Sequence, residues 1–240
     1  MNRILFLSAC IAPGNMYFTK LTDVAIRQKQ YIAALQWYLN NTNFKILFVE
    51  NTNCDLSEYF VNEIKNGRLE MLTFNGNDYD IKRGKGYGEA LILEYGLNHS
   101  ALLKQASSFV KITGRLICTN INLLTKCCGK DNVLYARIVR DEQKKLTCDS
   151  RLFISSLDFL RIFLSKKESL NDSNHFYFEH LLFNVRSLWI SGKKKATEPW
   201  LPMNIIGESG STGSVYNELS IIDILKFYCK RVLHCVHYYV

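Results

Sequence analysis

The order of short apolar runs and helical segments in the first half of the chain restricts the fold more than any other feature. Residues 3–8, 44–50, 69–74 and 108–112 are apolar runs with the length of buried strands. Segments with helical spacing separate them. Strands joined through helices pair in parallel, and a parallel sheet needs helices on both faces. We therefore predict the α/β fold class, with a Rossmann-like, mostly parallel sheet that binds ligands beyond the carboxyl ends of its strands.

Beyond residue 130 the alternation is less regular. We expect a strand over residues 133–139 and helices over residues 156–165 and 176–189. Residues 191–202 read as a basic linker with a lysine triplet. The glycines and serines of residues 205–215 predict a segment too flexible for regular structure.

Residues 1–217 are predicted to form one domain, and residues 218–240 a basic amphipathic helix that belongs to this domain or extends from it. Helical spacing places Ile221, Leu225 and Tyr228 on one side. Basic residues lie broadly opposite, at Lys226, Lys230, His234 and His237. Such a helix either contacts an anionic membrane surface or packs on the core with its basic face in water.

Net charge, cysteine spacing and hydrophobic content indicate the class of partner and exclude some classes of protein. The chain has 30 Lys and Arg against 22 Asp and Glu, a net charge of +8, which indicates an anionic partner: nucleic acid, a membrane surface or a phosphorylated ligand. The eight cysteines show no Cys-x-x-Cys pair and no Cys/His zinc spacing, so we expect reduced thiols in a cytoplasmic protein. With 48% hydrophobic residues the chain is not mainly disordered, and no apolar run has the roughly 20 residues that span a bilayer.

The segment RGKGYGE, residues 83–89, is the first candidate for binding chemistry. Glycines such as Gly86 let a phosphate approach the backbone, Arg83 and Lys85 add positive charge, and the following helix offers free N–H groups. The spacing matches neither a Walker loop nor a dinucleotide-binding fingerprint. The segment is therefore either a phosphate-binding loop or a tight turn between strand and helix.

The segment KITGR, residues 111–115, is the second candidate. Strand alternation places Lys111 and Thr113 on one face, and the following glycine turns the chain so that Arg115 projects from the carboxyl edge. A lysine and an arginine that converge there suit a diphosphate. The alternative is that Arg115 only pairs with a structural carboxylate such as Glu89.

Together these segments resemble a family, the bacterial sugar transferases of surface-polysaccharide gene clusters. Its members often read R-x-K-Q-Y, F-x-E-N, RGKGYGE and KITGR, with an asparagine five residues further on. The resemblance covers roughly the first 125 residues and continues more weakly beyond them. The matching positions are residues 27–31, 48–51, 83–89 and 111–115 with Asn120, then residues 149–151, Glu179 and residues 207–213.

The resemblance implies a nucleotide-sugar-dependent glycosyltransferase of the GT-A type, a single α/β domain. Many proteins with that fold hold a divalent metal on the donor diphosphate through Asp-x-Asp, where this chain has Thr113, Gly114 and Arg115. We therefore predict no cofactor and no Asp-x-Asp metal site, and the alternative is a divalent metal held by other residues. Lys111, Arg115 and Lys85 are expected to neutralise the diphosphate instead.

An inverting transferase also needs a carboxylate to take the proton of the acceptor hydroxyl. Glu179 stands where many GT-A enzymes carry that base at a helix start, with Asp149 as the second choice. The alternative for Glu179 is an ordinary acidic residue that the helix dipole favours.

The other predicted site residues fall into two groups. Ser8, Glu50 and Asn51 end the first two strands, where the resemblance implies contact with the nucleoside; otherwise they are polar strand ends. The acceptor or a lid over the site is assigned to Glu89, Asn120, Ser209 and Gly210.

The implied partners are a nucleotide-sugar donor and a glycan or lipid-linked glycan acceptor of capsule, O-antigen or lipopolysaccharide synthesis. The expected location is the cytoplasm, with peripheral contact to the inner face of the bacterial plasma membrane. One alternative is a nucleic-acid-binding protein, which fits the charge and the aromatic content but lacks a recognisable module. A nucleotidyltransferase is the other.

Overall fold

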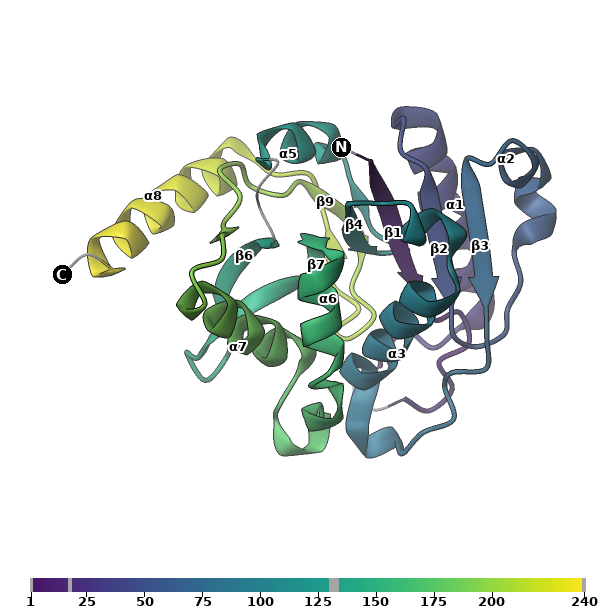
Figure 1. Ribbon diagram of the computed structural model, residues 1–240, viewed down its shortest axis with the longest axis horizontal. Helices are drawn as coiled ribbons and strands as arrows, with labels where there is room; N and C mark the ends of the chain where they lie inside the picture. The colour runs from purple at the N-terminus through teal and green to yellow at the C-terminus, as the bar shows by residue number, and fades with distance from the viewer. Residues whose placement is uncertain (1, 17–18, 130–133, 239–240) are drawn as a thin grey trace.

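The computed structural model describes residues 2–16, 19–129 and 134–238. Its centre is a seven-stranded sheet with the order β3-β2-β1-β4-β7-β6-β8, in which all strands but β7 run in one direction (Figure 1). The predicted α/β class with a mostly parallel sheet is therefore confirmed. The strands are β1 (Arg3–Ala9), β2 (Ile46–Glu50), β3 (Leu69–Thr73), β4 (Ser108–Thr113), β6 (Leu134–Arg140), β7 (Leu146–Ser156) and β8 (Ala196–Thr197).

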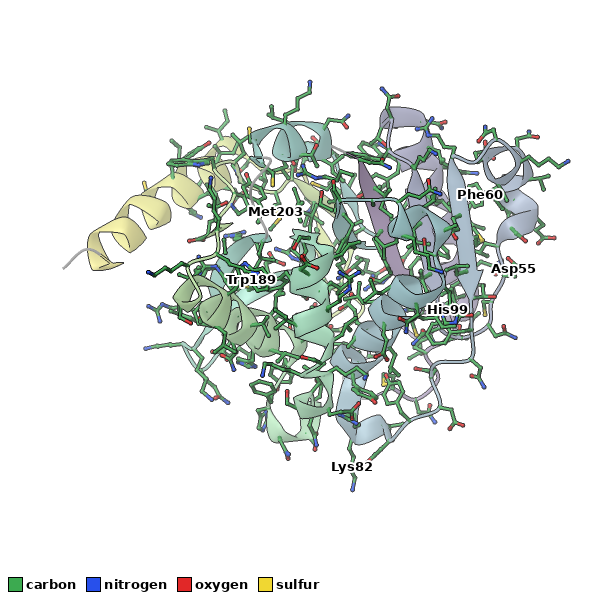
Figure 2. All side chains as sticks on the ribbon, in the orientation of Figure 1. Asp55, Phe60, Lys82, His99, Trp189 and Met203 are labelled. Atoms are coloured by element: carbon green, nitrogen blue, oxygen red, sulfur yellow. The ribbon has the colours of Figure 1, made fainter. Side chains whose placement is uncertain are left out.

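Helices cover both faces of the sheet because alternate strand residues point to opposite sides. In β1, Leu5 and Leu7 belong to the core under α1 and α5, whereas Ile4 and Phe6 belong to the core under α3, α6 and α7. Figure 2 labels Met203 in the first core and Trp189 in the second. The helices are α1 (Val24–Asn41), α2 (Val61–Lys65), α3 (Gly84–His99), α4 (Ala101–Lys104), α5 (Ile121–Cys127), α6 (Leu157–Leu164), α7 (Phe178–Ser191) and α8 (Ile221–Tyr238), with 3-10 turns at Ser57–Phe60, Ile81–Arg83, Lys167–Ser169 and Asp172–Asn174.

Strand β7 is an element of the central sheet that the sequence did not reveal. Its middle is polar, with Asp149, Ser150 and Arg151 in sequence, so it lacks the apolar pattern of a buried strand. Residues 149–152 also lie opposite Arg137 alone in β6, a β-bulge that interrupts the ladder. Because β7 runs against β4, the bulge lies at the carboxyl end of β4.

The prediction of no regular structure over residues 205–215 is wrong at both ends of that segment. β9 (Ile205–Glu208) pairs antiparallel with β10 (Val215–Tyr216), and β9 also pairs with β5 (Ile117–Cys118) in a second, three-stranded sheet. Residues 209–214 form the turn between them. Its Gly210 carbonyl accepts hydrogen bonds from the backbone N–H groups of Lys20 and Leu21, at 2.9 and 3.4 Å.

The predicted C-terminal helix is present as α8, which lies at the β6 side of the molecule with its last turns clear of the other elements (Figure 1). In the part of the chain that the structure describes, no helix is long and apolar enough to cross a membrane. Residues 239 and 240 lie outside the described residues.

Candidate functional site

A cavity of about 890 Å³ opens at the carboxyl ends of β1, β2 and β4. The first turns of α3 and α7, the bulge of β7 and the turn at 209–212 complete its walls. Between β1 and β4 the covering helices change face, since α1 packs on one side of the sheet and α3 on the other. Ligands of open α/β sheets bind at such a point.

Most of the predicted site residues meet in this cavity, although they come from distant parts of the chain. Four do not line it: Glu50, Arg83, Lys111 and Asn120. The residues that do are Ser8, Asn51, Lys85, Gly86, Glu89, Thr113, Arg115, Asp149, Glu179, Ser209 and Gly210.

Lys111 lies beneath the cavity wall and does not face a ligand. Its side chain is 0% exposed, forms an ion pair with Glu89, and donates a hydrogen bond to the Ser150 carbonyl at 2.6 Å. Ser8 Oγ donates to Glu89 Oε1 at 2.9 Å. A buried ammonium must keep such partners, so direct contact with a diphosphate, as predicted for Lys111, is wrong.

Arg83 is also engaged elsewhere. Its guanidinium pairs with the Glu168 carboxylate at 2.7 Å and donates to the carbonyls of Glu168 and Leu170. It also lies over the Tyr87 ring, 3.6 Å from the ring centroid. Arg83 therefore fastens the start of α3 to residues 168–170, and its predicted role in diphosphate binding is wrong.

The glycine-rich segment is a helix start and not a loop. α3 begins at Gly84, whose φ is +75°, and a Cβ at this position would collide with the Asp172 carboxylate. A Cβ on Gly86 would lie 3.1 Å from the backbone nitrogen of Phe178. These glycines therefore let the protein's own Asp172 and the start of α7 approach α3, where we predicted a phosphate.

Asp172 is the site residue that the sequence did not indicate. Its side chain is 2% exposed and lines the cavity, and among the described residues its Oδ1 has no hydrogen-bond partner. Burial raises the pKa of Asp172 from 3.8 to about 6; Lys85 opposes the rise, and the Glu179 carboxylate adds to it. The carboxyl group is therefore partly protonated near neutral pH.

Two cations, Lys85 and Arg115, face the cavity with no carboxylate bound to them among the described residues. Lys85 Nζ donates to Ser211 Oγ, and Arg115 Nη1 donates to the Glu208 carbonyl. Burial lowers the pKa of both groups. An ideal Cβ on Gly210 would lie 2.5 Å from Arg115 Nη2, so the turn at 209–212 lies against these cations.

Asp149 is a poor candidate for the base. Arg151 donates to both of its carboxylate oxygens, at 2.9 and 2.6 Å. Burial alone would raise the pKa of Asp149, but the hydrogen bonds and charge of Arg151 outweigh it and hold that pKa below its usual value. A carboxylate paired in this way takes up a proton reluctantly.

Glu179 lines the cavity in the first turn of α7. Its Oε1 accepts a hydrogen bond from Ser150 Oγ at 2.5 Å. The neighbouring His180 accepts the Tyr177 backbone N–H at Nδ1, 3.1 Å away, so its proton is on Nε2 and points to Asp141 Oδ2 at 2.9 Å. These contacts hold the start of α7 against the hairpin between β6 and β7.

The two neighbours at the end of β2 differ sharply. Glu50 is fully buried and accepts the backbone N–H groups of Ile11, Thr52 and Cys54 at 2.8 to 2.9 Å, so its predicted contact with the nucleoside is wrong. Asn51 lines the cavity, and its buried Oδ1 has no partner among the described residues.

Asn77 was not predicted from the sequence, but it resembles Asn51. It lines the cavity, and its buried Oδ1 has no hydrogen-bond partner among the described residues. Its place just after β3 is a signal that could have found it. Asn120 is structural, because its amide bonds the Pro202 carbonyl at 2.9 Å and the Asn204 N–H at 3.0 Å. Its predicted role at the acceptor or lid is therefore wrong.

The chain has Thr113, Gly114 and Arg115 where many GT-A enzymes hold a metal through Asp-x-Asp. Among the described residues, no three His, Cys, Asp or Glu side chains lie together as a metal site.

The chain matches no family model and no curated protein sequence. Among solved structures it is similar to a cytidylyltransferase from Leptospira borgpetersenii, at 12% identity and a TM-score of 0.46, over 100% of this chain and 88% of that one. It is similar to the mannosyltransferase Ktr4p from S. cerevisiae (11%, 0.44, 74% of this chain and 62% of that one) and to the glycosyltransferase GlyE from Streptococcus pneumoniae (10%, 0.48, 82% and 45%).

We expect substitution of Glu50 to change the free energy of unfolding much more than substitution of Asn51. Glu50→Ala leaves three buried N–H groups without an acceptor and should lower the free energy of unfolding by about 3 kcal/mol or more. Asn51→Ala removes an oxygen without a partner and should change it by less than about 1 kcal/mol. Urea unfolding measures both; a stable Glu50→Ala protein with weakened nucleotide binding would contradict this division.

Asp172 should reduce stability at neutral pH. Its native pKa of about 6 lies above the unfolded 3.8, so ionisation destabilises the fold as the pH rises between these values. Asp172→Asn should therefore raise the free energy of unfolding at pH 8 by up to about 3 kcal/mol and leave it unchanged at pH 4. Unfolding curves at the two pH values test this, and a variant that is less stable than wild type at pH 8 refutes it.

Proposed function

We propose that this protein is a glycosyltransferase that moves a sugar from a nucleotide-sugar donor to a glycan acceptor. The observation that carries the proposal is that three groups meet in the cavity: Lys85 and Arg115, which have no carboxylate bound to them among the described residues, and Glu179, whose Oε2 has no hydrogen-bond partner there. Lys85 and Arg115 also belong to the two segments that resemble sugar transferases of surface-polysaccharide synthesis.

The cavity offers complementary surfaces for the two ends of a nucleotide sugar. Asn51 and Asn77 line the cavity beyond the ends of β2 and β3, where amide groups suit the N–H and O–H groups of a nucleoside. Lys85 and Arg115 suit the diphosphate, because one is a compact charge and the other a planar fork. Asp172 also lines the cavity, where a carboxyl group suits the hydroxyl groups of a sugar.

The chemistry divides between these groups. The bond between the sugar and the diphosphate breaks, and Lys85 and Arg115 stabilise the charge that develops on the departing nucleotide. The acceptor hydroxyl forms the new bond and gives its proton to Glu179. Ser150 donates to Oε1 of Glu179, which keeps Oε2 available for that proton.

A nucleic-acid-binding function fits the site less well. Arg27 and Arg151, the other two arginines of the cavity, are engaged with the Cys10 and Leu21 carbonyls and with Asp149. These two arginines are engaged within the protein and lie in a cavity, whereas nucleic-acid binding favours a basic stripe on the surface.

Product analysis tests the proposal. The protein is incubated with UDP-, GDP- and CMP-sugars and with free and lipid-linked oligosaccharides. A sugar attached to the acceptor, together with free nucleotide, supports glycosyl transfer. Release of pyrophosphate from nucleoside triphosphate and sugar phosphate identifies a nucleotidyltransferase and overturns the proposal.

Substitution of Arg115, in residues 111–115, and of Arg83, in residues 83–89, should affect the rate of transfer differently. Arg115→Ala should lower the rate of transfer by about 100-fold or more, because it removes charge stabilisation of the leaving group. Arg83→Ala, the matched control, should retain the rate to within a few-fold after its stability is checked. Transfer by wild type should survive EDTA; strong inhibition by EDTA, or equal losses in both variants, would contradict the assignment.

A further inference from the structure

Helix α8 begins at a reciprocal pair of hydrogen bonds between Ser220 and Asp223, which are close in the sequence. Ser220 Oγ accepts the Asp223 N–H at 3.2 Å, and Asp223 Oδ2 accepts the Ser220 N–H at 3.1 Å. This reciprocal pair satisfies N–H groups that a helix start otherwise leaves free. From there the helix extends along the β6 side of the molecule (Figure 1).

The apolar side of α8 faces away from the protein. Ile221, Ile222 and Leu225 are 77%, 62% and 59% exposed. With 3.6 residues per turn they fall, with Ile224 and Tyr228, within an arc of about 160°. Phe227 lies outside this arc, and its ring is the one that contacts the body, 5.5 Å from the guanidinium of Arg137 on β6.

Positive charge accompanies the exposed apolar arc. Lys226 is exposed next to it, and the sequence of α8 contains Lys230 and Arg231 against the single acidic residue Asp223. The exposed lysines 193–195 directly precede β8, which pairs with β6, the strand that Phe227 contacts. Trp200, just after β8, is 64% exposed. Apolar and basic side chains therefore gather around one edge of the sheet.

We infer that α8 lies in the plane of an anionic membrane surface, with its apolar arc at the boundary between headgroups and acyl chains. Charge decides between this occupant and a second copy of the chain. A dimer through the arc would bring together two like-charged surfaces of a protein with a net charge of +8, whereas anionic lipid attracts them. This inference goes beyond the proposed transfer reaction and does not depend on it.

Sedimentation with vesicles tests the inference on the full chain. Wild type should bind vesicles of phosphatidylcholine mixed with phosphatidylglycerol, and bind phosphatidylcholine alone much more weakly. The double variant Ile221→Glu, Leu225→Glu should lose at least about tenfold in affinity, since it places charge in the arc. Lys226→Glu, which leaves the arc intact, should lose about fivefold or more. Val61→Glu, an exposed apolar position on α2 near the opposite edge of the sheet, is the matched control and should bind as wild type does.

Several results would overturn the inference. The membrane is not the partner of the arc if the wild type does not bind the anionic vesicles. The same conclusion follows if the double variant binds them as tightly as the wild type does. A wild-type dimer in sedimentation equilibrium that the double variant converts to a monomer assigns the arc to a second copy. All substituted positions are exposed, so the melting temperatures of the variants should stay near that of wild type. The variants should also bind nucleotide as wild type does, because the substitutions lie outside the cavity.

Discussion

The ammonium group of Lys111 links the elements on which the cavity depends. It is fully buried in β4, pairs with Glu89 of α3, and donates to the Ser150 carbonyl of β7, while Ser8 of β1 donates to the same Glu89. Loss of either partner would leave a buried charge at a cost of several kcal/mol, so the elements are fixed relative to one another. Ser150 is thereby placed to donate to Glu179, which connects the support of the cavity to its carboxylate.

Several residues that line the cavity have buried polar atoms without a hydrogen-bond partner among the described residues. Folded chains pair nearly all buried polar atoms, yet Asn51, Asn77 and Asp172, which line the cavity, each have a buried oxygen with no partner among the described residues. Lys85 and Arg115 supply hydrogen-bond donors and positive charge beside them. A ligand that satisfies both sets carries hydroxyl or N–H groups as well as phosphate, and a nucleotide sugar carries all of these. Asp172, which destabilises the fold when ionised, fits the general observation that sites retain groups unfavourable to stability.

The sequence predicted the sheet and the carboxyl edge at which the cavity opens, because apolar periodicity and the strand–helix order are local properties. It failed where a side chain's partner comes from far along the chain: nothing near Arg83 in sequence indicates Glu168, and nothing near Lys111 indicates Ser150. The polar bulge of β7 concealed a strand for the same reason. Asp172 was missed because the glycines that accommodate it belong to a segment typical of phosphate binding.

The measurement that tests the account most directly is the thermal stability of the wild-type protein with UDP, GDP, CMP and their sugar conjugates, in EDTA and in manganese. A ligand at about 100 times its dissociation constant adds about 2.7 kcal/mol to the free energy of unfolding, a clear rise in melting temperature. The account predicts stabilisation by one nucleotide class that persists in EDTA. Stabilisation in manganese alone would contradict the role given to Lys85 and Arg115, and no stabilisation by any of these ligands would contradict the nucleotide-sugar site.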